Sequence, residues 1–265
     1  MRTLPCKWED RTAAADQSYS VTEVYAMELT VLGKYGPYPV AGGATSGYLL
    51  KAGNTRLLLE CGSGVLSRLM SHLSLDRLDA IVISHLHSDH IADLLILRYA
   101  LQFIKMPPLK VFLPNRPYAE YDMLKGSGVF ELIPVNDGLR AKLGDAELEF
   151  WEMTHPVPSF GVRITSGGST LAYSGDTNLN QRLPHFFNGA DAALVDAGLM
   201  SFEKSGPAAP HLTAKEIGAL FSQTACRQVL LTHISPRVTD EQVESEARQG
   251  CAIAKVVKEG ETYRI

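Results

Sequence analysis

The sequence lacks the features of several protein classes. Its four cysteines form no CxxC pair, which argues against a zinc ribbon and against a disulfide scaffold; they are Cys6, Cys61, Cys226 and Cys251. No apolar run approaches the about 18 residues of a membrane span, because even residues 91–104 include Asp93, Arg98 and Gln102. The first 26 residues mix both charge signs without an apolar stretch, so they do not predict a secretory signal. We therefore expect a cytoplasmic protein with no membrane contact.

The chain also lacks an excess of positive charge. It contains 25 Lys+Arg against 29 Asp+Glu in 265 residues, for a formal net charge of −4. This balance gives no global positive field for a nucleic acid, so we expect no strong nucleic-acid-binding patch. We find no internal repeat and no low-complexity tract. The 45% hydrophobic content is that of a globular protein with a substantial core.

Strand and helix patterns begin at residue 27. We therefore expect a flexible extension over residues 1–26 and one domain over residues 27–265. Apolar runs predict strands at residues 27–32, 48–51, 55–60, 78–84, 110–113, 146–153, 161–165, 170–174, 192–195, 228–231 and 252–257. Helical spacing predicts helices at residues 65–73, 91–104, 213–222 and 240–248. Strands in runs with interspersed helices indicate an α/β (α+β) fold with two sheets face to face and helices outside them.

Three histidines and an aspartate lie within six residues, directly after the strand predicted at residues 78–84. Residues 85–90 read HLHSDH. Side chains alternate along an extended backbone, so His85 and His87 point to the same side. The chain then turns into a helix, which places Asp89 and His90 near its N-terminus, facing a neighbouring point. This arrangement can serve two adjacent metal positions.

Further ligand-type residues follow other predicted strands. A metal such as zinc takes about three or four protein ligands, so the HLHSDH segment alone is incomplete. His155, Asp176 and His233 each lie just beyond an apolar run, where the rim of a sheet gathers side chains from distant parts of a chain. These positions predict a metal site. His211 opens a predicted helix, whereas His72 and His185 are expected to be ordinary surface or hydrogen-bonded residues.

Together, these residues resemble the metallo-β-lactamase superfamily, whose hallmark is HxHxDH followed by a single His, a single Asp and a final His. The match spans nearly all of residues 27–265. It implies a four-layer αββα sandwich of two mixed β-sheets flanked by helices. It also implies two divalent metal ions, Zn²⁺ in the first place and Mn²⁺ as an alternative. One ion would be held by His85, His87 and His155, the other by Asp89, His90 and His233, and both by a bridging Asp176.

Finer motifs resemble the ribonuclease Z-like branch of that superfamily. His211 begins an HLTA segment similar to that group's motif before the last ligand, PLKV at residues 108–111 is similar to its PLxV strand, and LTHISPR at residues 231–237 is similar to its closing LTHxSPR segment. The tRNA-binding arm of those enzymes lies between the third His and the bridging Asp. Here His155 and Asp176 are only 21 positions apart, which leaves no room for it. The resemblance is therefore to the small, armless bacterial hydrolases of this branch.

Two positions qualify the resemblance. A bridging Asp at position 176 is similar to the phosphodiesterase and glyoxalase branches, and it disfavours true β-lactamase activity. Glu60 stands where the family usually has an Asp that supports a ligand histidine. Glutamate can make the same hydrogen bond from one methylene further away, so we expect Glu60 to keep this supporting role.

The expected activity is that of a dinuclear metal-dependent phosphodiesterase acting on a small or single-stranded phosphodiester, such as a cyclic nucleotide or a short RNA. Two metals about 3.5–4 Å apart can share a hydroxide and lower its pKa toward neutrality. Asp89 and His211 are the expected catalytic residues, and His211 would donate a proton to the leaving oxygen or hydrogen-bond a phosphate. Ser235 and Arg237 are expected to bind substrate, Arg237 through its phosphate.

Other functions stay open at this point. A glyoxalase-type thioester or lactone hydrolase could use the same hydroxide on an acyl carbon. A metal-stabilised binding or regulatory module would need no turnover. A tRNA 3′-processing endonuclease would need an arm supplied by a partner subunit. A homodimer is a further expectation, because relatives in this branch are often dimers and the apolar helix at residues 91–104 could lie at the interface.

Overall fold

The structure is a computed structural model that describes residues 26–265. Residues 1–25 of the predicted extension lie outside the described residues. Its strands are β1 (Met27–Gly33), β2 (Gly47–Ala52), β3 (Thr55–Leu59), β4 (Ala80–Val82), β5 (Leu109–Leu113), β6 (Phe130–Pro134), β7 (Arg140–Leu143), β8 (Ala146–Glu152), β9 (Phe160–Ser166), β10 (Ser169–Tyr173), β11 (Ala192–Asp196), β12 (Gln228–Thr232), β13 (Ala254–Val256) and β14 (Thr262–Arg264). Its helices are α1 (Val65–His72), α2 (Ser88–Gln102), α3 (Tyr118–Leu124), α4 (Leu183–Phe187), α5 (Ala214–Phe221) and α6 (Asp240–Ala247), with a 3₁₀ turn at Leu75–Arg77.

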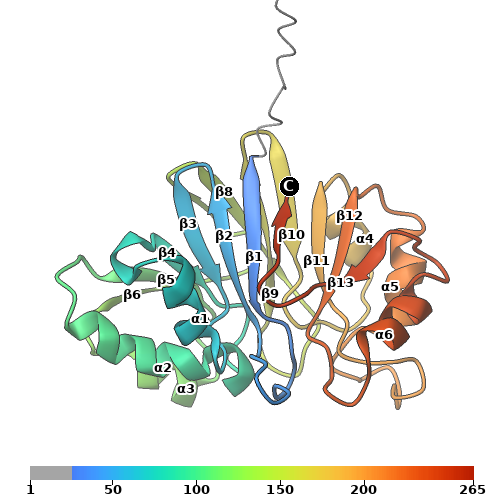
Figure 1. Cartoon of the computed structure of the whole chain (residues 1–265), viewed down its shortest axis with the longest axis horizontal. Coiled ribbons are helices and arrows are strands. Elements are labelled where there is room, and N and C mark those ends of the chain that lie inside the picture. Colours follow the sequence, from blue (N-terminus) through green and yellow to red (C-terminus); the bar gives the residue numbers. More distant parts are fainter. Residues whose placement is uncertain (1–25) are drawn as a thin grey trace, which may run out of the picture.

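Two seven-stranded sheets form the centre of the molecule. Their strand orders are β14-β1-β2-β3-β4-β5-β6 and β13-β12-β11-β10-β9-β8-β7. Both sheets are mixed, because β1–β3 and β8–β10 pair antiparallel whereas β3–β6 and β10–β13 pair parallel. The sheets lie face to face, with α1–α3 outside the first and α4–α6 outside the second (Figure 1). The predicted αββα sandwich is confirmed.

Successive side chains along the strands point to opposite faces of each sheet and contribute to three apolar clusters. Leu57 and Leu59 of β3 point into the cluster between the sheets, where Phe150 and Leu171 come from the second sheet. Leu58, between them, joins the cluster under α1 and α2. This alternation follows from the two-residue period of a strand. Both faces of β3 are covered at Leu57–Leu59, and these three residues are all apolar.

The carboxyl ends of the strands that lead to the predicted site meet at one edge of the sandwich. β4 runs into α2 there, and the chain leaves β8, β10 and β12 just before His155, Asp176 and His233. β4 is shorter than the predicted strand over residues 78–84. Its last predicted residue, Ser84, donates its N–H to the side chain of Glu60 instead of a neighbouring strand. The strand therefore ends where the site begins.

The edge of the first sheet is formed by the last residues of the chain. β14 pairs antiparallel with β1, with Glu28 opposite Arg264. Met27 and Ile265 exchange both of their backbone hydrogen bonds, at 3.1 and 3.0 Å. Among residues 26–265, no helix is long and apolar enough to span a membrane.

Candidate metal centre

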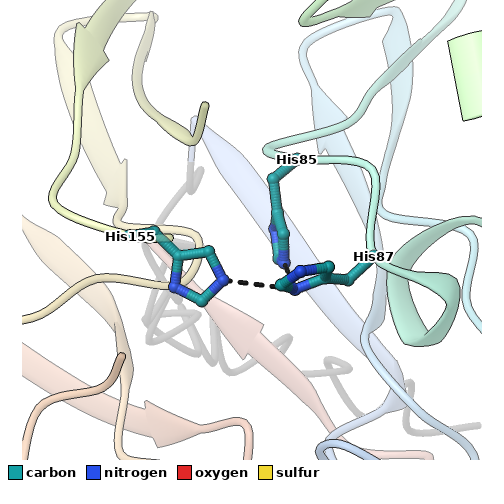
Figure 2. Close-up of side chains that lie close together, drawn as sticks. All are labelled: His85, His87 and His155. Atoms are coloured by element: carbon teal, nitrogen blue, oxygen red, sulfur yellow. Dashed lines mark hydrogen bonds between the residues drawn. The ribbon is translucent and has the colours of Figure 1, made fainter. Parts of the chain in front are cut away.

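Three histidines converge where β4 and β8 end (Figure 2). Nε2 of His85 lies 3.0 Å from Nδ1 of His87, and Nε2 of His155 lies 3.2 Å from the same atom. Nitrogens bound to one tetrahedral ion at about 2.0–2.1 Å would lie about 3.3–3.4 Å apart. The spacing of the three nitrogens therefore fits a single metal ion.

The protonation of these rings also fits a metal. Nδ1 of His155 lies 3.1 Å from the carbonyl oxygen of Pro210. A carbonyl only accepts, so Nδ1 carries the proton and Nε2 of the neutral ring presents a lone pair toward His87. Burial lowers the pKa of His85, of His87 and of His155. The three rings are therefore neutral, which is the form that binds metals.

A second group of ligand atoms lies beside the first. Nε2 of His233 is 3.2 Å from Oδ2 of Asp89, and Nε2 of His90 is 3.5 Å from the same oxygen. Both ring nitrogens of His90 are buried without a hydrogen-bond partner among the described residues. An unpaired buried polar atom costs free energy, and in a native structure it often indicates an ion. The three side chains can hold a second metal.

Asp176 lies between the two groups. Its Oδ2 is 3.6 Å from Nε2 of His85 and 3.3 Å from Nε2 of His233, and its Oδ1 is 3.4 Å from Nε2 of His90. The carboxylate therefore faces both groups at once. With it, the structure brings together all seven predicted ligands in two adjacent sets: His85, His87, Asp89, His90, His155, Asp176 and His233.

The centre concentrates buried negative charge. Glu60, Asp89, Asp176 and Asp196 all form their ion pairs here with histidines. Burial opposes ionisation of Asp176, but the surrounding histidines hold its pKa well below the usual range. Burial likewise opposes the charge on His90, but the carboxylates of Asp176 and Glu60 raise its pKa well above the usual value, and a metal ion held here would displace that proton. Such a cluster favours bound cations, and imidazole nitrogens with carboxylate oxygens suit zinc or manganese.

Glu60 lies next to His90, and its own backbone conformation is strained. Its Oε2 is 3.4 Å from Nδ1 of His90, and its Oε1 accepts from the N–H of Ser84 at 3.0 Å. Within residues 26–265, Glu60 and His233 are the only non-glycine residues with positive φ, at 61° and 57°. Such conformations cost about 1–3 kcal/mol each and persist where the surroundings fix them. Both strained residues belong to the metal centre.

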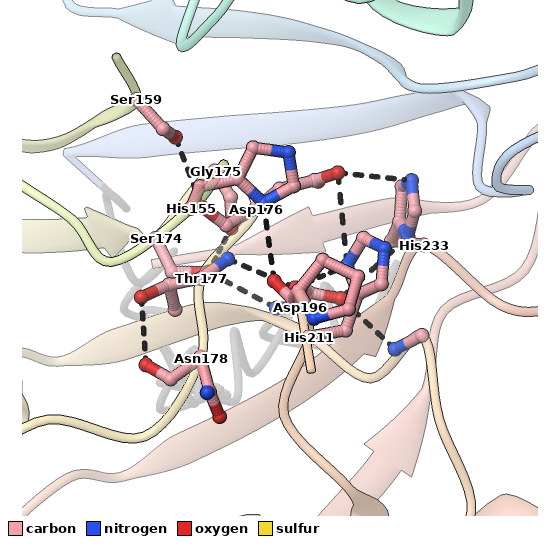
Figure 3. A network of polar contacts seen from close by, with 12 residues as sticks. His155, Ser159, Ser174, Gly175, Asp176, Thr177, Asn178, Asp196, His211 and His233 are labelled. Atoms are coloured by element: carbon pink, nitrogen blue, oxygen red, sulfur yellow. Dashed lines mark hydrogen bonds and ion pairs between the residues drawn. The ribbon is translucent and has the colours of Figure 1, made fainter. Parts of the chain in front are cut away.

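Asp196 is a site residue that the sequence patterns missed. It ends β11, and its Oδ2 accepts from Nδ1 of His211 at 2.9 Å and from the N–H of Thr177 at 3.0 Å (Figure 3). Its Oδ1 accepts from the N–H of Gly198 at 2.9 Å and lies 3.6 Å from Nδ1 of His233. Backbone donors therefore occupy both oxygens, so we interpret Asp196 as orienting the two histidines. The sequence signal that could have identified Asp196 is an acidic residue directly after the apolar run at residues 192–195.

His211 lies at the border of the centre. Its Nδ1 is 3.7 Å from Oδ2 of Asp176, and its side chain is 16% exposed. Burial disfavours the charged ring, but Asp196 raises the pKa of His211 to about 9. The helix predicted to begin near His211 begins at Ala214, because Thr213 is the N-cap of α5. His211 therefore sits in the preceding loop, with a protonated ring at neutral pH.

The two predicted substrate-binding residues contact each other. Nε of Arg237 donates to Oγ of Ser235 at 3.3 Å, and its NH2 group lies 2.8 Å from Oε1 of Glu203. Ser235 is buried, whereas the Arg237 side chain is 65% exposed. The structure places neither side chain in hydrogen-bond contact with the seven predicted ligands described above. Their role in substrate binding stays a prediction.

A glycine-rich loop covers His233. The N–H of Gly36 donates to the carbonyl oxygen of Ile234 at 3.2 Å. A Cβ atom on Gly36 would lie 2.0 Å from Nε2 of His233. The backbone can approach this ring only because residue 36 has no side chain.

Similarity to known proteins identifies the family of this chain. The profile of the beta-lactamase superfamily domain matches residues 55–234. The chain belongs to the metallo-β-lactamase superfamily. It is 30% identical over 227 residues to the probable metallo-hydrolase YhfI of Bacillus subtilis, covering 84% of this chain and 93% of that protein. The crystal structure of YhfI matches the structure of this chain with a TM-score of 0.84 and 29% identity, over 90% of this chain and 99% of YhfI.

Ribonuclease Z proteins are more distant relatives. The ribonuclease Z of Methanopyrus kandleri is 25% identical over 268 residues, covering 88% of this chain and 96% of that protein. The short form of human tRNase Z shares the fold, with a TM-score of 0.71 at 19% identity over 90% of this chain and 99% of that one. The predicted resemblance to this branch of the superfamily is confirmed. Between His155 and Asp176, the structure contains only β9, β10 and their short connections.

Proposed function

We propose that this protein is a dinuclear metal-dependent phosphodiesterase that cleaves a small or single-stranded phosphodiester, such as a cyclic nucleotide or an RNA-like substrate. The family and the His/Asp cluster identify a metallo-hydrolase. The observation that carries the finer proposal is the carboxylate of Asp176, which faces two adjacent ligand sets. Paired metal ions suit in-line displacement at phosphorus. Relatives named ribonuclease Z support the same substrate class.

The side chains of the centre have distinct tasks in this reaction. When bound, two divalent ions supply a water-derived nucleophile at neutral pH and neutralise charge on the phosphoryl group. His85, His87 and His155 would hold one ion; Asp89, His90 and His233 would hold the other. Asp176 keeps the two positions adjacent, and Glu60 holds the ring of His90 through its ion pair with Nδ1 of that ring.

His211 handles the proton of the leaving group. Its Nδ1 is engaged by Asp196, which leaves Nε2 as the free donor. A pKa of about 9 keeps the ring protonated at neutral pH. An alkoxide leaves more readily when a positioned acid protonates it. His211 therefore acts as the general acid. Asp196 orients its ring and keeps it protonated by raising its pKa.

The test combines metal quantification with a substrate panel. We expect turnover of bis-p-nitrophenyl phosphate and of 2′,3′- or 3′,5′-cyclic nucleotides, loss of turnover on chelation, and recovery with Zn²⁺ or Mn²⁺. An acyl thioester and a precursor tRNA complete the panel. Turnover of the thioester alone would replace the proposal with a glyoxalase-type hydrolase. Cleavage of the precursor tRNA alone would replace it with a 3′-processing endonuclease.

A further inference from the structure

The loop over residues 199–212, between β11 and α5, makes two contacts that the metal centre needs. The carbonyl of Pro210 accepts from Nδ1 of His155, which fixes the tautomer of that ligand. The next residue, His211, donates to Asp196. The loop contains neither helix nor strand, and an isolated β-bridge between Leu199 and Thr213 pairs only its two ends. Side-chain contacts must therefore help to hold the residues between them in place.

Glu203 attaches this loop to the segment that follows His233. Its Oε1 lies 2.8 Å from the NH2 group of Arg237, and its side chain is only 11% exposed. Its Oε2 accepts from the N–H of Met200 at 2.9 Å, within the same loop. Arg237 is four residues past His233 and also donates to Ser235. The pair thus connects the loop to the segment that follows β12 and contains His233.

Lys204, the next residue, attaches the loop on its other side. Its Nζ donates to Oδ1 of Asn178 at 2.6 Å and to the two carboxylate oxygens of Glu216 at 2.7 and 2.8 Å. Its side chain is 15% exposed, so these contacts are shielded from water. Glu216 belongs to the capping box of α5, which begins directly after the loop.

Asn178 carries this attachment into the metal centre. It is buried two residues past Asp176, and its backbone N–H donates to the carbonyl of Thr154, next to His155, at 2.7 Å. Its side-chain amide donates back to the carbonyl of Pro207 in the loop at 2.6 Å. Lys204 and Asn178 therefore join the loop to the segments that carry a bridging ligand and a histidine ligand.

We propose that Glu203 and Lys204 are positioning residues, which fix the 199–212 loop so that Pro210 and His211 meet their partners in the metal centre. This role makes Arg237 an anchor for the loop instead of a phosphate-binding residue. The charge-assisted contacts of Lys204 are shielded from water, so removing the lysine leaves the charge of Glu216 uncompensated. Glu203 is itself only 11% exposed, whereas its partner Arg237 is 65% exposed, so water screens this attachment more than that of Lys204. The kinetic effect rests on the proposed function, whereas the placement of the loop can be measured without any substrate.

The first experiment measures the loop directly. Hydrogen exchange followed by mass spectrometry is compared for the unaltered protein, Glu203→Gln and Lys204→Met. We expect exchange in peptides covering residues 199–212 to accelerate about tenfold in both variants, because each loses an attachment of the loop. Matched controls are Glu149→Gln, in an open surface pair, and Lys215→Met, at an exposed lysine beyond the loop. Unchanged exchange in the Glu203 and Lys204 variants would overturn the proposal.

The second experiment separates anchoring from phosphate binding. In a double-mutant cycle, Glu203→Gln, Arg237→Met and their combination are assayed on bis-p-nitrophenyl phosphate. We expect kcat to fall about tenfold in each single variant with KM unchanged, and the double variant to be no worse than either, because the two side chains act as one unit. An increase in KM in Arg237→Met alone would instead assign Arg237 to the substrate and overturn the anchor. A protein that hydrolyses no phosphodiester would contradict the proposed function and leave the exchange experiment to decide on the loop.

Discussion

The two halves of the molecule build the metal centre in different ways. The first half contributes four of the predicted ligands from six consecutive residues, 85–90, at the junction of β4 and α2. The second half contributes one predicted ligand after each of three separate strands, together with Asp196 and His211. Local backbone geometry sets the first group, whereas sheet register and the 199–212 loop set the second. Remote substitutions should therefore disturb the second half more readily than the first.

The largest effect is expected for Asp176, which faces both predicted ligand sets, and a smaller one for His87, which belongs to one set. Asp176→Ala should reduce bound metal at both positions and lower phosphodiester turnover by about a thousandfold or more, because its carboxylate faces both sets. His87→Ala should reduce metal mainly at the first position. Elemental analysis of the purified variants, paired with turnover of bis-p-nitrophenyl phosphate, distinguishes the two. Full activity after chelation and in Asp176→Ala would exclude the metal-dependent mechanism.

A smaller effect is expected where the second half supplies a proton instead of a ligand. His211→Ala should lower kcat by about a hundredfold or more with the metal content retained, because positioned acids contribute on this scale. Elemental analysis again serves as the control. Equal losses of metal and of kcat would reassign His211 as a ligand.

The pH dependence of kcat sharpens this test. Burial lowers the pKa of His211, but Asp196 raises it to about 9, so the acid form persists up to that pH. Asp196→Asn removes the negative charge, and the pKa should fall toward the unperturbed value of about 6.5. Because the protonated ring is the active form, kcat should decline above about pH 6.5 in the variant instead of above about pH 9. Identical alkaline limbs in the two proteins would contradict the pairing.

A moderate effect on stability is expected at the loop over His233. In Gly36→Ala, the new methyl group would lie 2.0 Å from Nε2 of this ligand, so loop or ring must move. Such overpacking costs about 1–3 kcal/mol in the free energy of unfolding, which urea denaturation measures. Gly42→Asn is the control, since a side chain there meets open space and asparagine tolerates positive φ. Equal stability of Gly36→Ala and the unaltered protein would show that the ring moves freely.

The smallest effect is expected far from the centre. Glu149→Gln breaks an ion pair with Arg140, whose side chain is 78% exposed. Open pairs of this kind contribute little to stability, because water screens them. Metal content, turnover and the midpoint of thermal unfolding should all stay unchanged. A clear loss in any of them would indicate that the outer face of β7 and β8 influences the centre.

The sequence was sufficient to predict which histidines and aspartates converge, because the segments that carry them follow apolar runs. A buried strand must end at a rim, and polar, metal-binding side chains placed just past several such ends have few purely structural uses. The same rule explains why the two sheets and the helices α1, α2, α5 and α6 were predicted close to their observed positions. The missed elements α3, α4, β6, β7 and β14 are short, and several are half exposed, so they show little apolar periodicity.

The contacts between loops could not be predicted in the same way. The sequence patterns did not single out Asp196, because an aspartate directly after a predicted strand is also an ordinary turn residue. Arg237 was predicted to meet a phosphate, and the structure places Glu203 against it. Glu203 and Lys204 lie in a loop without periodicity, and their partners are 12 to 34 positions away along the chain. Only the folded arrangement brings these charges together.

The pairing of β1 with β14 has a consequence for synthesis. The strand that begins the described domain has the last residues of the chain as one of its two neighbours, and Ile265 is buried against it. During translation, the nascent first sheet must therefore wait with an open edge until residue 265 has left the ribosome. A fusion partner or affinity tag attached after Ile265 would lie beside the start of β1, because Met27 and Ile265 exchange both of their backbone hydrogen bonds.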